Sequence, residues 1–222
     1  MRFIAIIFTI LVALSTSAAE LSTLTKEGDF PAIYKVGTKT ARGYGGGTAF
    51  LVKHPTSGKI VAVTNRHVCD VPSLTGIFEL VKESSQSLAK IERKSKRADL
   101  CLLTIKEGFS PEGKLVVLPL AKKNPIISSD VTAVGYAMLQ TFMKYSGSFE
   151  GIEAQPEDPT DPYMSGRDTG ITSFPIFHGN SGSPLLNPNG EVVGVMYAYT
   201  GNAKGLFVPL KALLYFLTNN EG

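Results

Sequence analysis

The sequence predicts an all-β protein, arranged as a barrel or a sandwich, with a single short helix at its C-terminal end. Two observations lead to this prediction. Short stretches rich in Val, Ile, Leu, Tyr and Phe alternate with Gly, Pro and Asn along most of the chain, which is typical of strands separated by turns. About eleven such stretches occur with almost no helical periodicity between them, and many short strands favour a barrel or a sandwich.

The first element is a predicted secretory signal peptide over residues 1–19. It has one cation, Arg2, then an apolar run over 3–14, and small residues at 17–19 where signal peptidase cuts. The apolar run is shorter than the roughly 20 residues that cross a bilayer. We therefore expect export, to the periplasm or outside the cell, without stable membrane insertion, and a mature domain over 20–222.

The mature chain divides into two predicted halves. Strands are expected at 32–36, 46–52, 60–64, 78–82, 88–94, 100–105, 130–136, 146–152, 183–186, 192–198 and 206–209. A polar segment rich in Gly, Pro, Lys and Glu at 106–124 is interpreted as a linker between halves of about 30–105 and 125–209. The acidic, proline-containing segment 153–170 is predicted to be a surface insertion.

The C-terminal helix is predicted over about 210–218. Leu210, Leu213, Leu214 and Leu217 follow the spacing of one helical face, and we expect that face to pack on the last sheet.

Charge and ligand-type residues exclude two function classes. The 22 Lys and Arg nearly balance the 19 Asp and Glu, so we expect no nucleic-acid partner, and the basic run over 90–97 is interpreted as a solvated strand. Two Cys and three scattered His lack the paired spacing of a zinc site, so we expect no metal site.

A glycine-flanked serine is the strongest candidate for chemistry. The segment 177–184, Phe-His-Gly-Asn-Ser-Gly-Ser-Pro, places Ser181 in a tight turn just before a strand. Such a turn exposes the hydroxyl and lets the N–H groups of Gly179 and Ser181 converge on one point, where an oxyanion would form. Taken alone, the segment also fits an ordinary glycine turn.

Two further segments supply the partners that a serine nucleophile needs. The strand over 60–64 runs out into His67, and Asp99 opens an apolar strand, where an unpaired carboxylate would be costly. A serine hydroxyl is weakly nucleophilic, and it requires an adjacent base oriented by a buried carboxylate. His67 and Asp99 are therefore candidates for these two roles.

The order His67, Asp99, Ser181 resembles the trypsin/chymotrypsin-fold serine endopeptidases. The motifs are Thr-Asn-Arg-His-Val at 64–68, Ala-Asp-Leu at 98–100 and Gly-Asn-Ser-Gly-Ser-Pro at 179–184. The last motif, with the segment 187–195 that follows, is similar to bacterial HtrA-type proteases and to the staphylococcal glutamyl endopeptidases. The resemblance extends from Gly45 to the C-terminal helix.

This resemblance implies two six-stranded antiparallel β-barrels with the active site between them. His67 would be the general base, Asp99 its orienting partner and Ser181 the nucleophile, and the N–H groups of Gly179 and Ser181 would form the oxyanion hole. The reaction would be hydrolysis of peptide bonds in protein or peptide substrates through an acyl-enzyme, without a metal or a cofactor.

The resemblance also indicates a substrate pocket without charge. Its expected residues are Phe174, His178, Met196, Tyr197, Tyr199 and Gly205. Met196 stands where the glutamyl endopeptidases have a histidine that recognises the substrate acid, so an apolar side chain at the cleaved position is the expectation. Tyr199 narrows the pocket in this interpretation. His178 is either part of the pocket or an ordinary polar residue at its mouth.

Cys69 and Cys101 lie two residues beyond His67 and Asp99. Because those two residues must touch in the implied site, and because the exported compartment is oxidising, we expect a disulfide, with two buried thiols as the alternative.

Two other functions compete with the endopeptidase. One is a protease-fold protein that binds without cutting. The other is an esterase of the α/β-hydrolase class, which the chain order His, Asp, Ser and the scarcity of helices argue against.

Overall fold

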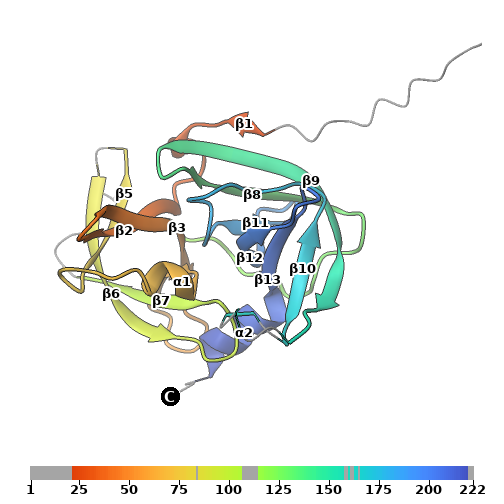
Figure 1. Cartoon of the computed structure of the whole chain (residues 1–222). Helices are drawn as coiled ribbons and strands as arrows, with labels where there is room; N and C mark the ends of the chain where they lie inside the picture. The colour runs from red at the N-terminus through yellow and green to blue at the C-terminus, as the bar shows by residue number, and fades with distance from the viewer. Residues whose placement is uncertain are drawn as a thin grey trace, which may run out of the picture.

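Two closed β-barrels, each of six antiparallel strands, form the chain and lie side by side (Figure 1). The structure is a computed structural model, and it describes residues 22–83, 85–106, 115–157, 160, 163–164 and 166–219. The predicted signal peptide and residues 107–114 of the predicted linker lie outside these residues. The two barrels confirm the fold class that the resemblance implied.

The N-terminal barrel closes in the order β2-β3-β4-β7-β6-β5. Its strands are β2 (Ile33–Thr40), β3 (Gly43–Lys53), β4 (Ile60–Thr64), β5 (Phe78–Lys82), β6 (Ser85–Lys94) and β7 (Cys101–Ile105). The short helix α1 (Arg66–Cys69) follows β4 and faces the other barrel in Figure 1.

The C-terminal barrel runs in the order β9-β10-β13-β12-β11-β8, and the pairing of β8 with β9 closes it. Its strands are β8 (Asp130–Ala137), β9 (Thr141–Ala154), β10 (Asp168–Thr172), β11 (Pro184–Leu186), β12 (Val192–Tyr199) and β13 (Gly205–Pro209). The two-residue strand β1 (Thr23–Leu24) pairs with β9, and the 3-10 turn η1 (Glu27–Asp29) leads from it to β2.

Alternating side chains give the molecule three apolar clusters. In β3, Leu51 points into the N-terminal barrel, whereas Phe50 points into a cluster shared by both barrels. This is the two-residue period of a strand with both faces covered. Tyr136 and Val195 enter the shared cluster from the C-terminal barrel, so the barrels are held together by apolar packing.

The predicted surface insertion at 153–170 is wrong at three places. Met164 is 1% exposed and belongs to the cluster between the barrels. Asp168–Thr172 is strand β10, and β9 extends to Ala154. The strand was hidden in the sequence because its buried side chains include a threonine, Thr169, whose hydroxyl pairs with that of Tyr197 at 3.0 Å.

The end of the predicted linker crosses from one barrel to the other. Leu118 N–H donates to Leu51 O on β3 at 2.8 Å. Three residues later, Ala121 N–H donates to Val192 O on β12 at 3.0 Å.

The C-terminal helix is confirmed as α2 (Leu210–Thr218). Its buried face comprises Leu210, Leu213, Phe216 and Leu217. Within the described part of the chain, we find no helix with the length and hydropathy to cross a membrane.

Candidate active site

His67 and Asp99 lie in contact on the side of the N-terminal barrel that faces its neighbour. His67 Nδ1 is 2.6 Å from Asp99 Oδ2, and the His67 backbone N–H donates to Asp99 Oδ1 at 2.9 Å. Asp99 is 1% exposed, and the Asn65 side chain donates to its backbone carbonyl at 2.8 Å. Because both carboxylate oxygens are engaged, Asp99 fixes the ring of His67 and leaves Nε2 as its free nitrogen.

A disulfide ties together the two segments that carry this pair. Cys69 and Cys101 are bonded, with their Cα atoms 6.5 Å apart. Both residues are buried. The structure thus contains the expected bridge rather than two thiols, and it joins α1 to the start of β7.

Removing the bridge with Cys69→Ala and Cys101→Ala should lower the free energy of unfolding by about 3–4 kcal/mol, the chain-entropy value for a loop of this length. The bonded residues are 32 apart in the sequence. Urea unfolding of the double variant beside the wild type measures the difference. A loss below about 1 kcal/mol would contradict the prediction.

Ser181 lies in a turn that the N-terminal barrel holds in place. Thr48 on β3 donates two hydrogen bonds to the turn. Its backbone N–H donates to Ser181 O at 2.8 Å, and its hydroxyl donates to Gly179 O at 2.9 Å. The side chain of Asn180, which is fully buried, donates to Tyr145 Oη at 3.0 Å. The turn is therefore fixed to both barrels.

Gly47 brings the serine turn and α1 side by side. A Cβ at this position would lie 2.5 Å from Ser181 O and 2.8 Å from Val68 Cγ2, the residue after His67. Only glycine fits between two segments this close. The Ser181 hydroxyl donates to Tyr197 O at 3.3 Å, and this is its one hydrogen bond to the described residues.

The turn also presents two free N–H groups. Neither Gly179 N nor Ser181 N donates to any described group. The carbonyl of His178 accepts from Met138 N–H at 2.6 Å. Since the C=O and N–H of a trans peptide point in opposite directions, this bond turns the N–H of Gly179 away from Met138.

The residues predicted to line the pocket separate into core and surface. Phe174 and Met196 are buried in the core of the C-terminal barrel. Gly205 packs against Met196, because a Cβ added at Gly205 would lie 2.7 Å from Met196 Cε. His178 and Tyr199 are exposed, and their rings meet edge to face with centroids 6.5 Å apart.

Tyr197 lies between these groups. It is half-buried, packs against the cluster between the barrels and reaches the Thr169 hydroxyl.

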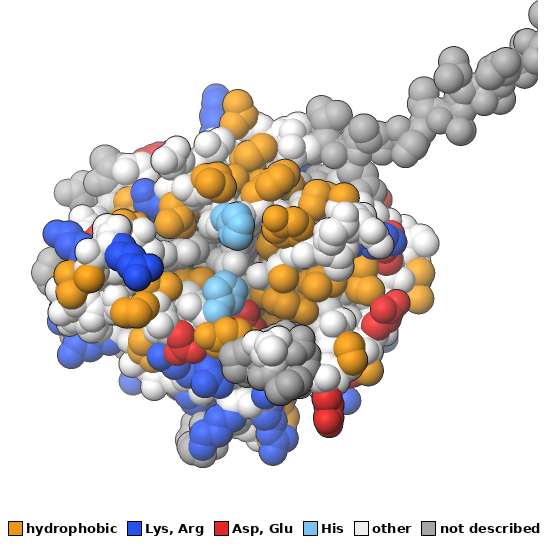
Figure 2. Space-filling view, viewed as in Figure 1, with side chains coloured by type: hydrophobic (Ala, Val, Ile, Leu, Met, Phe, Trp, Pro, Cys, Tyr) orange, Lys and Arg blue, Asp and Glu red, His pale blue; other side chains and the backbone are white. Residues whose placement is uncertain are grey.

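Hydrophobic side chains gather around the centre of the face that carries α1, and two histidines lie among them (Figure 2). Exposed apolar residues near the serine turn include Met138, Phe177 and Tyr199. These side chains make the surface around the serine turn apolar.

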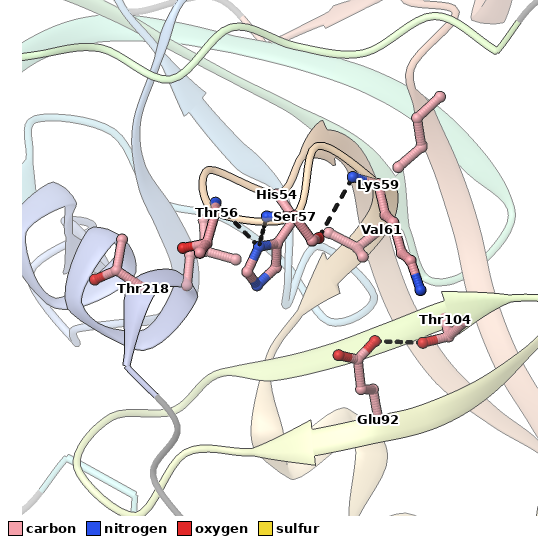
Figure 3. A pocket seen from close by; sticks show the side chains of 10 residues that line it. His54, Thr56, Ser57, Lys59, Val61, Glu92, Thr104 and Thr218 are labelled. Atoms are coloured by element: carbon pink, nitrogen blue, oxygen red, sulfur yellow. Dashed lines mark hydrogen bonds between the residues drawn. The ribbon is translucent and has the colours of Figure 1, made fainter.

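A hollow of about 500 Å³ lies away from the serine turn, between the β3–β4 loop, β6, β7 and α2. There, His54 Nδ1 accepts the N–H groups of Thr56 and Ser57, as Figure 3 shows. Its imidazole therefore caps its own turn. Glu92 accepts a hydrogen bond from the Thr104 hydroxyl and not from His54. Among the described residues of this hollow, His54 therefore has no carboxylate partner of the kind that Asp99 provides for His67.

Sequence reasoning missed several residues of the site. Asn65 lies within the motif of His67 and Thr48 lies within a predicted strand, but only the fold shows what they bind. Tyr163 packs against His67 from the segment that was taken for a surface insertion. Among the described residues there is no group of three or more Cys, His, Asp and Glu that would suit a metal ion.

Comparison with known proteins identifies the family. The family described as trypsin-like peptidase domain matches residues 47–195, a range that includes His67, Asp99 and Ser181. The chain belongs to the trypsin-like peptidase family. No sequence among curated proteins matches the chain closely enough to count as a relative.

Solved structures share this trypsin-like fold. The Rv3671c protease from M. tuberculosis, in its active form, superposes with a TM-score of 0.69 at 20% identity, covering 82% of this chain and 78% of that one. An inactive form of the same protein, a serine-to-alanine mutant from M. tuberculosis H37Rv, gives a TM-score of 0.67 at 19% identity, covering 86% and 89%. At these identities the likeness concerns the fold.

Proposed function

We propose that this trypsin-like peptidase is an exported serine endopeptidase that works with His67, Asp99 and Ser181. The contact between His67 Nδ1 and Asp99 Oδ2 carries the proposal. A carboxylate that is 1% exposed, aimed at one nitrogen of a half-exposed histidine, is the arrangement that prepares a general base.

In the proposed reaction, Ser181 Oγ attacks the carbonyl carbon of the scissile bond while His67 Nε2 takes the hydroxyl proton. The N–H groups of Gly179 and Ser181 would bind the oxyanion. His67 then gives the proton to the leaving amine, and a water molecule hydrolyses the acyl-enzyme by the same steps in reverse. The hydroxyl of Ser181 must first leave Tyr197 O, its acceptor in this structure.

Protein or peptide substrates with an apolar residue at the cleaved position fit this site best. Met196 is fully buried, so it offers no partner for a substrate acid. The exposed rings of His178 and Tyr199 stand at the expected entrance. A glutamate preference therefore has no support beyond the similarity of the serine motif.

Export is supported by the N-terminal pattern over residues 1–19 and by the disulfide. A bond between Cys69 and Cys101 forms and persists in an oxidising compartment, such as a periplasm or the exterior of a cell.

A second candidate is a protein of the same fold that binds peptides without cutting them. The observation that favours it is the hydrogen bond from Ser181 Oγ to Tyr197 O, which takes the hydroxyl away from the base.

Labelling with a fluorophosphonate separates the two candidates. We expect the mature wild-type protein to gain one adduct by intact-mass spectrometry and the Ser181→Ala variant to gain none. Absence of labelling in the folded wild type would refute the endopeptidase and support the binding protein. If the wild type is labelled, a peptide-library screen would define which residue the enzyme cleaves after.

A further inference from the structure

An aromatic ring from the C-terminal barrel packs against the imidazole of His67. Tyr163 lies between β9 and β10, and its ring meets that of His67 edge on, with centroids 5.9 Å apart and 62° between the planes. Contacts of this geometry are favourable between aromatic rings. The His67 ring is therefore held by Asp99 at Nδ1 and by Tyr163 at a second side.

The backbone beside Tyr163 is fixed at two points. The Arg167 guanidinium donates to Tyr163 O and, at 2.7 Å, to Lys96 O, three residues before Asp99. The next residue, Met164, is 1% exposed in the cluster between the barrels. The ring is thus attached to the core and to the segment that carries the acid.

The phenol end of Tyr163 is fixed as well. Its hydroxyl hydrogen-bonds to the Asp70 carboxylate, on the turn that ends α1. Asp70 also accepts from Lys94 Nζ at 2.5 Å and pairs with Arg66 Nε at 3.4 Å. Burial works to raise the pKa of Asp70, but the hydrogen bond and charge of Lys94 hold it below the ordinary value, so the acceptor stays ionised.

We propose that Tyr163 is a positioning residue, which holds the His67 imidazole against Asp99 from across the gap between the barrels. The inference rests on the proposed role of His67 as the general base. Tyr163 acts through His67, because its hydroxyl is occupied by Asp70. Anchored at both its backbone and its hydroxyl, the ring restricts rotation of the imidazole away from Asp99.

The test compares Tyr163→Ala with a matched control, Tyr215→Ala. Each ring lies beneath an arginine: the Arg66 guanidinium is 5.8 Å from the Tyr163 ring centroid, and that of Arg97 is 5.2 Å from the Tyr215 ring centroid. Tyr215, however, lies on α2. We expect Tyr163→Ala to lower kcat about 10- to 100-fold with KM within twofold, since small misplacements of a catalytic group have effects of this size. Tyr215→Ala should keep wild-type values.

A readout independent of turnover is the proton NMR resonance of His67 Nδ1–H, in the bond to Asp99. It should broaden or disappear in Tyr163→Ala and persist in Tyr215→Ala. This signal reports on the contact even if the fluorophosphonate fails to label the wild type, so the two proposals fail separately. Unchanged kcat together with an unchanged resonance in Tyr163→Ala would overturn the positioning role.

Two milder variants at the hydroxyl contact distinguish loss of positioning from a general loss of folding. Tyr163→Phe keeps the ring and loses the anchor, and Asp70→Asn weakens the same anchor from the other side. Each should give a smaller fall in kcat than Tyr163→Ala. The double variant should be no worse than the more affected single variant, because both substitutions act on the same bond between Tyr163 and Asp70 and only Asp70→Asn also alters the ion pairs with Lys94 and Arg66. Additive effects, or a Phe variant as impaired as the Ala variant, would contradict the proposed geometry.

Discussion

Replacing Asp99 with Asn should lower kcat by about 10⁴-fold while the protein stays folded. The Asp99 carboxylate accepts from His67 Nδ1 at Oδ2 and from the His67 backbone at Oδ1. An asparagine can keep the backbone bond through its oxygen, but it then turns its amide group, a donor, toward Nδ1. The imidazole would take the tautomer with the proton on Nε2, which cannot accept the proton of Ser181.

The measurement is kcat on a peptide selected from the library screen, for Asp99→Asn and for Asp130→Asn. Asp130 is exposed at the start of β8 and makes a fair control for the loss of one charge. Thermal unfolding should show that both variants are folded. A fall of less than 10-fold for Asp99→Asn would remove Asp99 from the role of orienting His67.

The strands that are easiest to predict are those whose buried side chains are apolar. Stretches such as 60–64 and 78–82 coincide with β4 and β5, because Val, Leu and Phe face the core there. In β10, by contrast, Thr169 and Thr172 are the inward residues and Gly170 faces the Phe207 ring. Pairing and packing with β13 therefore stabilise β10 as a strand, and no local apolar pattern in the sequence predicts it.

The candidate site divides in the same way between local and long-range information. Residue types and order were sufficient to nominate His67, Asp99 and Ser181, and the structure places His67 and Asp99 in contact. The contact of Tyr163 with His67 depends on two segments almost 100 residues apart meeting across the barrels. No pattern within one segment carries that information.

The rotamer of Ser181 and the orientation of the His178 carbonyl are also set by distant backbone. Tyr197 O accepts a hydrogen bond from the serine hydroxyl, and Met138 N–H donates one to the His178 carbonyl. Met138 and the following Leu139 both have positive φ, at 54° and 58°, although neither is glycine. Left-handed backbone at such residues is costly and persists where surrounding contacts impose it, so this turn was not predictable from its own residues.

Gly179→Ala should lower kcat/KM by at least about 10²-fold, the effect of losing one oxyanion donor. Gly179 has φ of +89°, and a Cβ there would lie 2.3 Å from Tyr136 O and 2.6 Å from Leu139 N. Both are backbone atoms, one at the end of β8 and one in the β8–β9 turn, so the new methyl group cannot be accommodated by a side chain moving aside. The serine turn must shift instead, and the N–H of Gly179 shifts with it.

Gly190→Ala is the matched control, because it separates backbone strain from the clash. Gly190 also has positive φ, at +75°, but a Cβ there would meet nothing within 4 Å. We expect Gly190→Ala to lose about 1 kcal/mol of stability with unchanged kcat/KM, since its only cost is an alanine in the left-handed backbone region. Equal activity in the two variants would show that the peptide between His178 and Gly179 is not held by the β8–β9 turn. A selective loss in Gly179→Ala, with KM nearly constant, would assign the Gly179 N–H to stabilising the transition state rather than to binding substrate.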